Sequence, residues 1–119
     1  MNIYDVAHQL AKELNASEDY QSYVIAKNKV KEDAANTKML ADFQMKQFEI
    51  QQYQILGQEV SQEKQAELER LYSLVSLNPV IKDYLEAEFK FSRMMNDIQK
   101  ILSEAVKEAI PIAFENEKQ

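Results

Sequence analysis

The chain has 119 residues and a formal net charge of −6, with one glycine, two prolines, one histidine and no cysteine or tryptophan. The absence of cysteine excludes disulfide frameworks, thiolate zinc sites and cysteine-ligated iron–sulfur clusters. So few glycines and prolines exclude a turn-rich all-β fold and a glycine-rich phosphate loop. The length fits one domain, 1–119, and we predict that it is all-α.

The acidic charge balance predicts a protein without a general affinity for nucleic acid. No apolar run approaches the roughly 20 residues that cross a bilayer, so membrane insertion is not expected. The first residues carry no positively charged segment followed by an apolar stretch, which is the pattern of a secretion signal. We therefore expect a cytoplasmic protein.

The N-terminal region, 1–35, is predicted to form two short helices. Ile3, Val6, Leu10 and Leu14 follow the spacing of one helical face, and Asn2 can cap that helix. Ser17 suits the N-cap of a second helix that continues to about residue 34. Its apolar face is sparse, which predicts a half-buried helix.

The middle region, 36–77, is predicted to contain two helices. Asn36 or Thr37 can cap the first, which runs to about Leu56 and ends at Gly57, the only glycine. Ser61 can cap the second, which extends to the end of the region. The apolar positions of the first helix are too many for one narrow seam, so we expect this helix to touch more than one neighbour.

The C-terminal region, 78–112, is predicted to be one long helix. Asn78 can act as N-cap with Pro79 in the first turn, and the apolar spacing continues to Ala109. A helix over 79–110 is about 48 Å long at about 1.5 Å per residue. Pro111 should kink or end the helix, and the tail 113–119 is expected to fray.

This length predicts the overall arrangement, because a compact chain of this size has a radius of gyration of only about 13–14 Å. We expect an elongated antiparallel helical hairpin, in which the long C-terminal helix packs on the helix over 36–56, with the helix after Ser61 extending that neighbour. Such a hairpin leaves one flank of an apolar stripe in water, so we predict a homodimer. The residues predicted to lie at a dimer or partner interface are Phe43, Gln47, Ile50, Gln54, Tyr84, Glu88, Phe91, Met95 and Ile98.

Catalytic and metal-binding constellations are not found in the sequence. His8, the only histidine, falls on the polar side of its helix, so a solvated side chain is the default interpretation. Glu88 falls on the apolar seam of the long helix. Its carboxylate either pairs with Lys46, Lys90 or Arg93, or it remains in water while the methylene groups of the side chain cover apolar surface. No catalytic residue, metal, cofactor or small-molecule substrate is therefore assigned.

Other groups of side chains have both a functional and a structural interpretation. The lysines at 27, 29, 31 and 38 could contact phosphate, but a solvated helix face is the default for such a cluster. The glutamines between 44 and 58 could form a polar ladder at an interface or act as good surface helix formers. The tyrosines at 20, 23 and 53 and the methionines at 94 and 95 suit either a partner contact or the core.

Four motifs in order along the chain resemble the YheA branch of the YlbF/YmcA-like family, over residues 3 to about 110. They are Ile3-Tyr4-Asp5-x-Ala7-x-x-Leu10-x-x-x-Leu14-x-x-Ser17-x-x-Tyr20, Asp42-Phe43-x-x-x-Gln47-x-Glu49-x-Gln51-x-x-Gln54-x-x-Gly57, Asn78-Pro79-x-Ile81-x-x-Tyr84-Leu85-x-Ala87-Glu88 and Asp97-Ile98-x-x-Ile101. The resemblance implies an all-helical, usually dimeric bacterial cytoplasmic protein without known catalysis.

The relatives YlbF and YmcA act as non-catalytic adaptors that influence mRNA processing and so competence, sporulation and biofilm formation. Those relatives carry cysteines linked to iron–sulfur clusters, and since this chain has none, that cofactor is not expected. The first hypothesis is therefore a non-catalytic homodimeric adaptor that binds another protein. The alternatives are a helical-hairpin chaperone or scaffold that grips client segments, direct RNA binding through the lysine cluster, and an enzyme acting through the acidic side chains around Glu88.

Overall fold

The computed structural model describes the backbone of residues 1–118 and the side chains of residues 1–115. Within these residues the chain forms five α-helices, one short 3-10 helix and no strand, which confirms the all-α prediction. The elements are α1 (Ile3–Ala16), α2 (Glu18–Lys31), α3 (Ala34–Ile55), α4 (Gln62–Ser76), α5 (Pro79–Ala105) and η1 (Ile112–Lys118).

The helix starts follow local capping chemistry. Asn2, Ser17, Ser61 and Asn78 cap α1, α2, α4 and α5 as predicted, and Gly57 adopts a φ of 70° just beyond the end of α3. A side chain at that φ would be strained, which is why the left-handed position after a helix favours glycine.

The cap of α3 differs from the prediction, which placed it at Asn36 or Thr37. Asp33 is the N-cap, and its carboxylate accepts hydrogen bonds from the backbone N–H groups of Ala35 and Asn36 at 2.8 and 3.2 Å. The Thr37 hydroxyl instead donates to the backbone carbonyl of Val30 at 3.1 Å. Three good capping residues lie close together here, and the most N-terminal one begins the helix.

The long helix α5 is also shorter than predicted, because it ends at Ala105 rather than Ile110. Pro111 lacks an N–H group, and its ring disfavours a helical conformation in the residue before it. Packing does not hold the preceding turn in a helix either, since Val106 is exposed. The tail predicted to fray, 113–119, lies in the 3-10 helix up to Lys118, and residue 119 lies outside the described residues.

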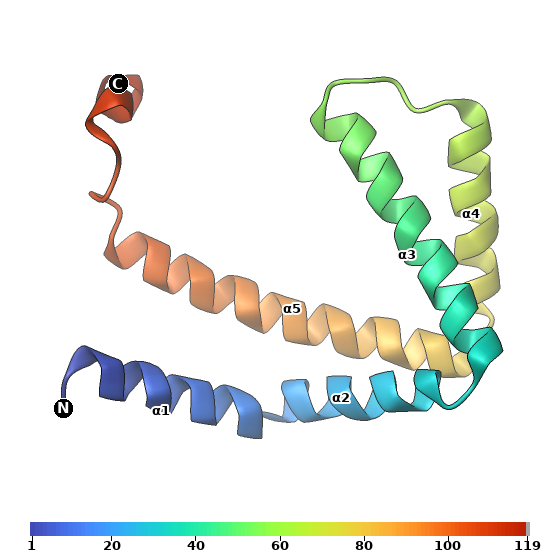
Figure 1. The fold of residues 1–119 in the computed structure, drawn as a ribbon, viewed down its shortest axis with the longest axis horizontal. Coiled ribbons are helices and arrows are strands. Elements are labelled where there is room, and N and C mark those ends of the chain that lie inside the picture. Colours follow the sequence, from blue (N-terminus) through green and yellow to red (C-terminus); the bar gives the residue numbers. More distant parts are fainter. Residues whose placement is uncertain (119) are drawn as a thin grey trace.

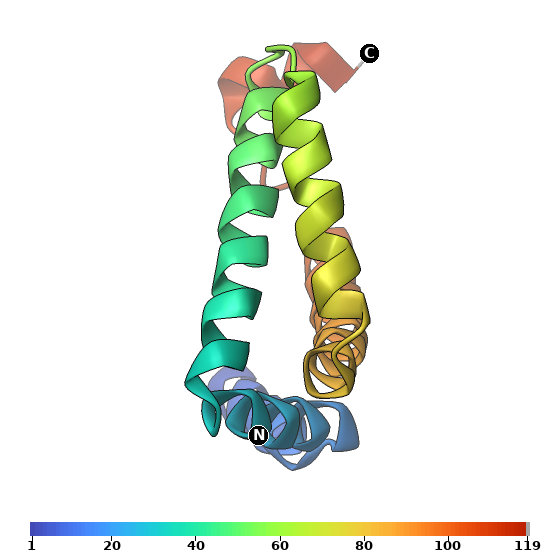
Figure 2. The same cartoon turned by 90° about the vertical axis from the view of Figure 1, so that its right-hand side faces the viewer.

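The helices form two arms that meet at an elbow, which is where α2 leads into α3 and α4 leads into α5. In the first arm α1 and α2 follow one another and α5 returns antiparallel along α2, while α3 and α4 form the second arm (Figure 1). Figure 2 shows α3 and α4 side by side above the first arm. The principal extents are 47 × 39 × 16 Å, so the molecule is thin as well as long.

The pairing of α5 corrects the predicted hairpin. Its main neighbour is α2, whereas α3 packs chiefly on α4 and touches α5 over a short stretch. At the elbow the Asn78 side-chain amide donates a 2.7 Å hydrogen bond to the side-chain oxygen of Asn36. The residue that begins α5 therefore also ties this helix to the start of α3.

The main hydrophobic core lies at the elbow and takes residues from α2, α3, α4 and α5. Val75 and Ile81 are fully buried, and the cluster comprises Ala26, Val30, Leu40, Phe43, Leu71, Val75, Ile81 and Tyr84. Helix α1 contributes no buried residue. The core therefore stabilises one end of the first arm and leaves its other end without comparable packing.

Candidate protein-interaction surface

An aromatic cluster joins α2 to α5. Phe91 stacks on Tyr23 with ring centroids 5.3 Å apart and lies 5.5 Å from the ring of Tyr20. The hydroxyls of Tyr23 and Tyr84 are 3.4 Å apart. Burial raises the pKa of Tyr84, and the neighbouring Tyr23 hydroxyl and Glu88 carboxylate raise this pKa further. These side chains bind two helices of the same chain together.

The predicted interface residues on α5 contribute to this internal seam to different degrees. Tyr84 is buried, whereas Glu88, Phe91, Met95 and Ile98 are half-buried. Glu88 forms no ion pair with a described residue, and its carboxylate lies close enough to Tyr84 to influence the pKa of that hydroxyl. Apolar contact along α5 thus decreases from the elbow toward the C-terminal end of the helix.

The predicted interface residues on α3 lie in the other arm. Phe43 and Ile50 are buried, and the Phe43 ring lies 6.0 Å from that of Tyr72 on α4. Gln47 and Gln54 are exposed. The structure therefore distributes the predicted interface over two internal seams, α2–α5 and α3–α4, and does not bring its residues together on one face.

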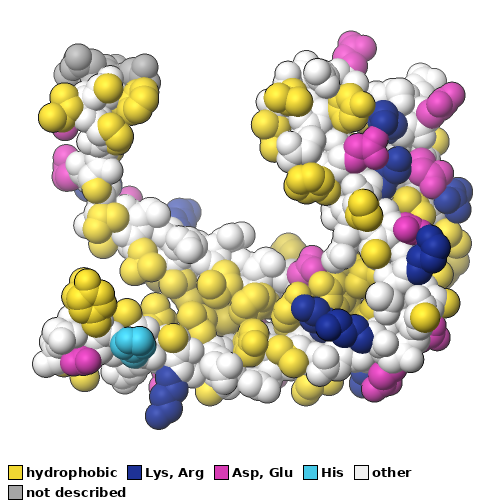
Figure 3. All heavy atoms as spheres, in the orientation of Figure 1, with side chains coloured by type: hydrophobic (Ala, Val, Ile, Leu, Met, Phe, Trp, Pro, Cys, Tyr) yellow, Lys and Arg dark blue, Asp and Glu magenta, His cyan; other side chains and the backbone are white. Residues whose placement is uncertain are grey.

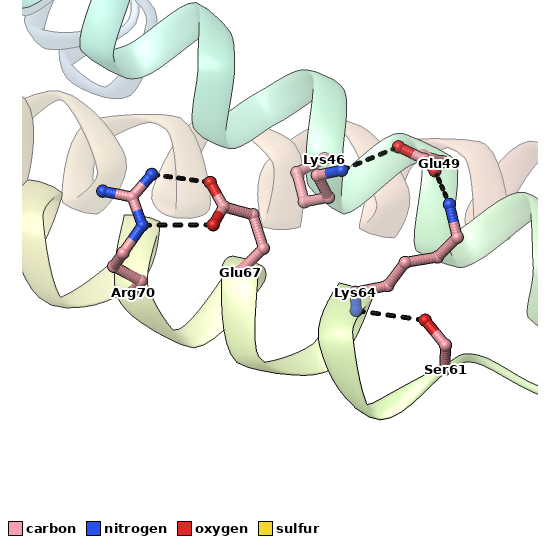
Figure 4. A network of polar contacts seen from close by, with 6 residues as sticks. All are labelled: Lys46, Glu49, Ser61, Lys64, Glu67 and Arg70. Carbon is pink, nitrogen blue, oxygen red and sulfur yellow. Dashed lines mark hydrogen bonds and ion pairs between the residues drawn. The ribbon is translucent and has the colours of Figure 1, made fainter.

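An ion-pair network lies on one flank of the second arm (Figure 4). Lys46 of α3 donates to Glu49 at 3.1 Å, and Lys64 of α4 donates to the other carboxylate oxygen of Glu49. On α4 the Arg70 guanidinium binds both carboxylate oxygens of Glu67, at 2.6 and 3.1 Å. Lys46 is thus paired with Glu49 and not with Glu88.

The network makes a pH-dependent contribution to stability. The two lysines hold the pKa of Glu49 below its usual value of 4.5, chiefly through the hydrogen bond from Lys64. Because the pKa is lower in the folded chain, the stabilisation is fully present above pH 4.5 and is lost as the pH falls through the folded pKa. We expect the melting temperature of Glu49→Gln to fall less steeply with acidification below pH 4.5 than that of the wild type.

The matched control for this comparison is Glu69→Gln. Glu69 is an exposed residue of α4 that takes part in none of the ion pairs between described residues. Melting curves recorded over the acid range should show the wild-type slope for this control. If the melting temperatures of the wild type and Glu49→Gln fell equally steeply with pH, the ion pairs of Glu49 would not stabilise the protein in solution.

Large apolar side chains are exposed on all five α-helices, and groups of three or more lie on α1, on α3 and toward the end of α5. On α1 they are Ile3, Tyr4, Val6 and Leu10, on α3 they are Met45, Phe48 and Ile55, and toward the end of α5 they are Ile101, Leu102 and Val106. In Figure 3 hydrophobic side chains gather between the α1–α2 layer and α5, and again on the flank of α3 that faces the hollow side of the molecule. The sequence signalled this surface, since it predicted an apolar face on the first helix and an over-wide apolar stripe on the third.

The remaining candidate groups do not assemble a reactive site. His8 is exposed on α1, and Lys27, Lys29 and Lys31 are exposed on α2. Lys38 forms a 2.9 Å ion pair with Asp42. Within the described part of the chain no three His, Asp or Glu side chains are grouped so that they could hold a metal ion. No described helix has the continuous apolar length that a bilayer crossing requires.

Comparison with known proteins identifies the family of this chain. Residues 3–107 match the family model described as "Control of competence regulator ComK, YlbF/YmcA". A UPF0342 protein of Desulfitobacterium hafniense is 53% identical over 119 residues, covering 100% of this chain and 96% of the relative. A UPF0342 protein of Halothermothrix orenii is 44% identical over 102 residues, covering 86% of each chain.

A solved structure supports the same fold. The protein of unknown function DUF964 from Bacillus stearothermophilus superposes with a TM-score of 0.75 at 21% sequence identity, covering 89% of this chain and 93% of that chain. The match of the family model over most of the chain decides the classification. The chain belongs to the YlbF/YmcA family.

Proposed function

We propose that this chain is a non-catalytic, cytoplasmic homodimer that acts as an adaptor by binding another protein. The observation that carries the proposal is the amount of surface that the single chain leaves in water. Its accessible surface is 9659 Å², whereas a compact monomer of 13.9 kDa exposes about 6,700 Å². The exposed surface exceeds that of a compact monomer by about 3,000 Å², and large apolar side chains are exposed on all five α-helices.

The shape of the chain supports the same proposal. The radius of gyration is 19.1 Å, against about 13–14 Å for a compact domain of this length. Contiguous apolar patches larger than a few hundred Å² are rare on monomers and mark interaction sites. A thin, two-armed chain with groups of exposed apolar side chains on α1, α3 and α5 is suited to binding proteins over a large area.

The family membership indicates the kind of process that the adaptor serves. The matching family model is described as a control of a competence regulator. We propose that the partner belongs to the regulation of RNA processing or of development, as the resemblance to YlbF and YmcA implies. The α3 stripe, which we define as Met45, Phe48 and Ile55, is the surface that we assign to this partner, because all three side chains are exposed.

A chaperone or scaffold is the second candidate function. Met45 and Phe48 are exposed neighbours on α3, and they line a shallow groove with Ala41 and Gln44. A flexible methionine beside an aromatic ring adapts to varied apolar segments. This groove would let the chain hold unfolded clients instead of one defined partner.

Affinity purification from the native host, followed by mass spectrometry, tests the two candidates against each other. The wild type is compared with Phe48→Glu, and Gln51→Glu adds the same charge at another exposed position of α3. A short reproducible set of partners that is kept by Gln51→Glu and lost by Phe48→Glu supports the adaptor. A diffuse set of unfolded proteins favours the chaperone, and a wild type that captures nothing contradicts both.

A further inference from the structure

The end of the first arm that lies away from the elbow carries two apolar stripes without a partner. We define the projecting arm as α1 together with residues 92–105 of α5. On α1 the exposed apolar residues Ile3, Val6 and Leu10 follow helical spacing, and on α5 the half-buried Ile98 and the exposed Ile101 and Leu102 do the same. Such spacing is typical of a helix face that packs against other helices.

The two halves of the projecting arm do not bury these stripes against each other. No Cα atom of α1 lies within 8 Å of a Cα atom of α5, and Figure 1 shows α5 moving away from the α1–α2 layer as it runs from the elbow toward its C-terminal end. Hydrogen bonds hold that junction, because the Ser17 hydroxyl donates to the Leu14 carbonyl at 2.7 Å and accepts from the Tyr20 N–H at 3.2 Å. The Gln21 side chain adds a 2.7 Å bond to the Asn15 carbonyl.

We infer that a second copy of this chain packs on the projecting arm and buries these stripes, so that two copies of α1 and two copies of the end of α5 form a four-helix bundle about a two-fold axis. The inference rests on the homodimer of the proposed function and names the surface that forms it. Helix α1 has 14 residues, about 21 Å at about 1.5 Å per residue, and 92–105 is equally long. Because the two helical segments of each projecting arm have the same length, the arms of two copies can pack along their whole length, as a self-complementary two-fold contact requires.

The exposed area agrees with a second copy as the occupant. Obligate homodimers bury about 2,000–5,000 Å² in total, which is about 1,000–2,500 Å² on each chain. The excess of about 3,000 Å² over a compact monomer is large enough to supply this area. The α3 stripe then remains free for a different partner.

The charges of the projecting arm argue against a lipid surface. The arm has three cationic and four anionic side chains, a net charge of −1, and they are Lys12, Arg93, Lys100, Asp5, Glu13, Asp97 and Glu104. Helices that bind anionic membranes carry a surplus of Lys and Arg on their polar face. A nearly neutral arm allows two copies to approach despite the −6 charge of each chain.

The molar mass in solution tests the inference, measured by light scattering on size-exclusion chromatography at several protein concentrations. The wild type should have twice the chain mass of 13.9 kDa, that is 27.8 kDa. Val6→Glu and Leu102→Glu each place a charge on one stripe and should halve this mass. Both side chains are more than half exposed in the single chain, so the helix content measured by circular dichroism should be retained.

Phe48→Glu is the control, because it makes the same kind of change on α3 and should keep the wild-type mass. A dimeric wild type with Val6→Glu and Leu102→Glu also dimeric overturns the location of the contact and leaves the proposed homodimer intact. A monomeric wild type overturns the homodimer itself. If a monomeric wild type binds anionic vesicles or a different protein through Leu102, the arm belongs to that occupant.

Discussion

Replacing Ile81 by alanine is expected to lower the free energy of unfolding by about 3–4 kcal/mol, since buried Ile-to-Ala changes cost about 2–5 kcal/mol. Ile81 is fully buried and belongs to the elbow cluster. The four helices that meet there cannot all move to fill the lost volume, because each is also held by its partner within an arm. Chemical unfolding by urea, followed by circular dichroism at one fixed protein concentration, measures the loss.

The matched control for this prediction is Ile25→Ala. Ile25 lies within α2 and is 57% exposed, so the same chemical deletion should cost less than about 1 kcal/mol. Equal losses for the two variants would mean that the elbow does not pack in solution as it does in the structure. A large loss is serious for this chain, because domains of this size are stable by only about 5–15 kcal/mol.

The local features of the fold were predictable because they depend on residues close together in the sequence. Ser17, Ser61 and Asn78 are capping residues in front of apolar periodicity, and Gly57 is the residue type preferred at the left-handed position after α3. The two helix boundaries that were predicted wrongly lie where nearby residues also favour a different boundary. Three capping side chains stand at the start of α3, and apolar spacing continues beyond the true end of α5 to Ala109.

The pairing of the arms could not be deduced in the same way. The apolar seam of α3 is compatible with α4 or α5 as its neighbour, because a helical period does not identify which helix covers it. What selects α2 for α5 is the match of aromatic side chains between them, Tyr20 and Tyr23 with Phe91 and Tyr84. That match depends on contacts between residues more than sixty positions apart, as for Tyr23 and Tyr84.

The predicted interface was affected by the same ambiguity. Seam positions are apolar whether their neighbour belongs to the same chain or to another. Phe43, Ile50 and Tyr84 are buried within the chain, whereas groups of exposed large apolar residues lie on α1, on α3 and toward the end of α5. Sequence periodicity thus identified apolar faces of the helices. Only the structure shows which of these faces are covered by another helix of the same chain and which remain exposed.

Phe91→Ala has the second large expected effect, a loss of about 2–3 kcal/mol of stability. The full range for buried Phe-to-Ala changes is about 3–5 kcal/mol, and Phe91 is only half-buried. The change removes the stacking on Tyr23 and the contact with Tyr20, and aromatic pairs contribute about 0.5–1.5 kcal/mol each beyond their buried area. The chain has no tryptophan and six tyrosines, and three of these, Tyr20, Tyr23 and Tyr84, lie in this cluster, so tyrosine fluorescence during urea unfolding includes its signal.

Phe89→Ala is the matched control, since Phe89 lies on the same helix, is 66% exposed and has the Arg93 guanidinium 5.9 Å from its ring centroid. This variant should lose less than about 1 kcal/mol. The sequence assigned Phe91 to contacts between chains, and the structure places the ring against α2 of its own chain. If Phe91→Ala dissociated the dimer with stability and tyrosine fluorescence unchanged, the ring would belong to the contact between chains. If Phe91→Ala makes the chain unfold more easily at every protein concentration, Phe91 holds the first arm together. A variant at this position is then no test of the proposed dimer.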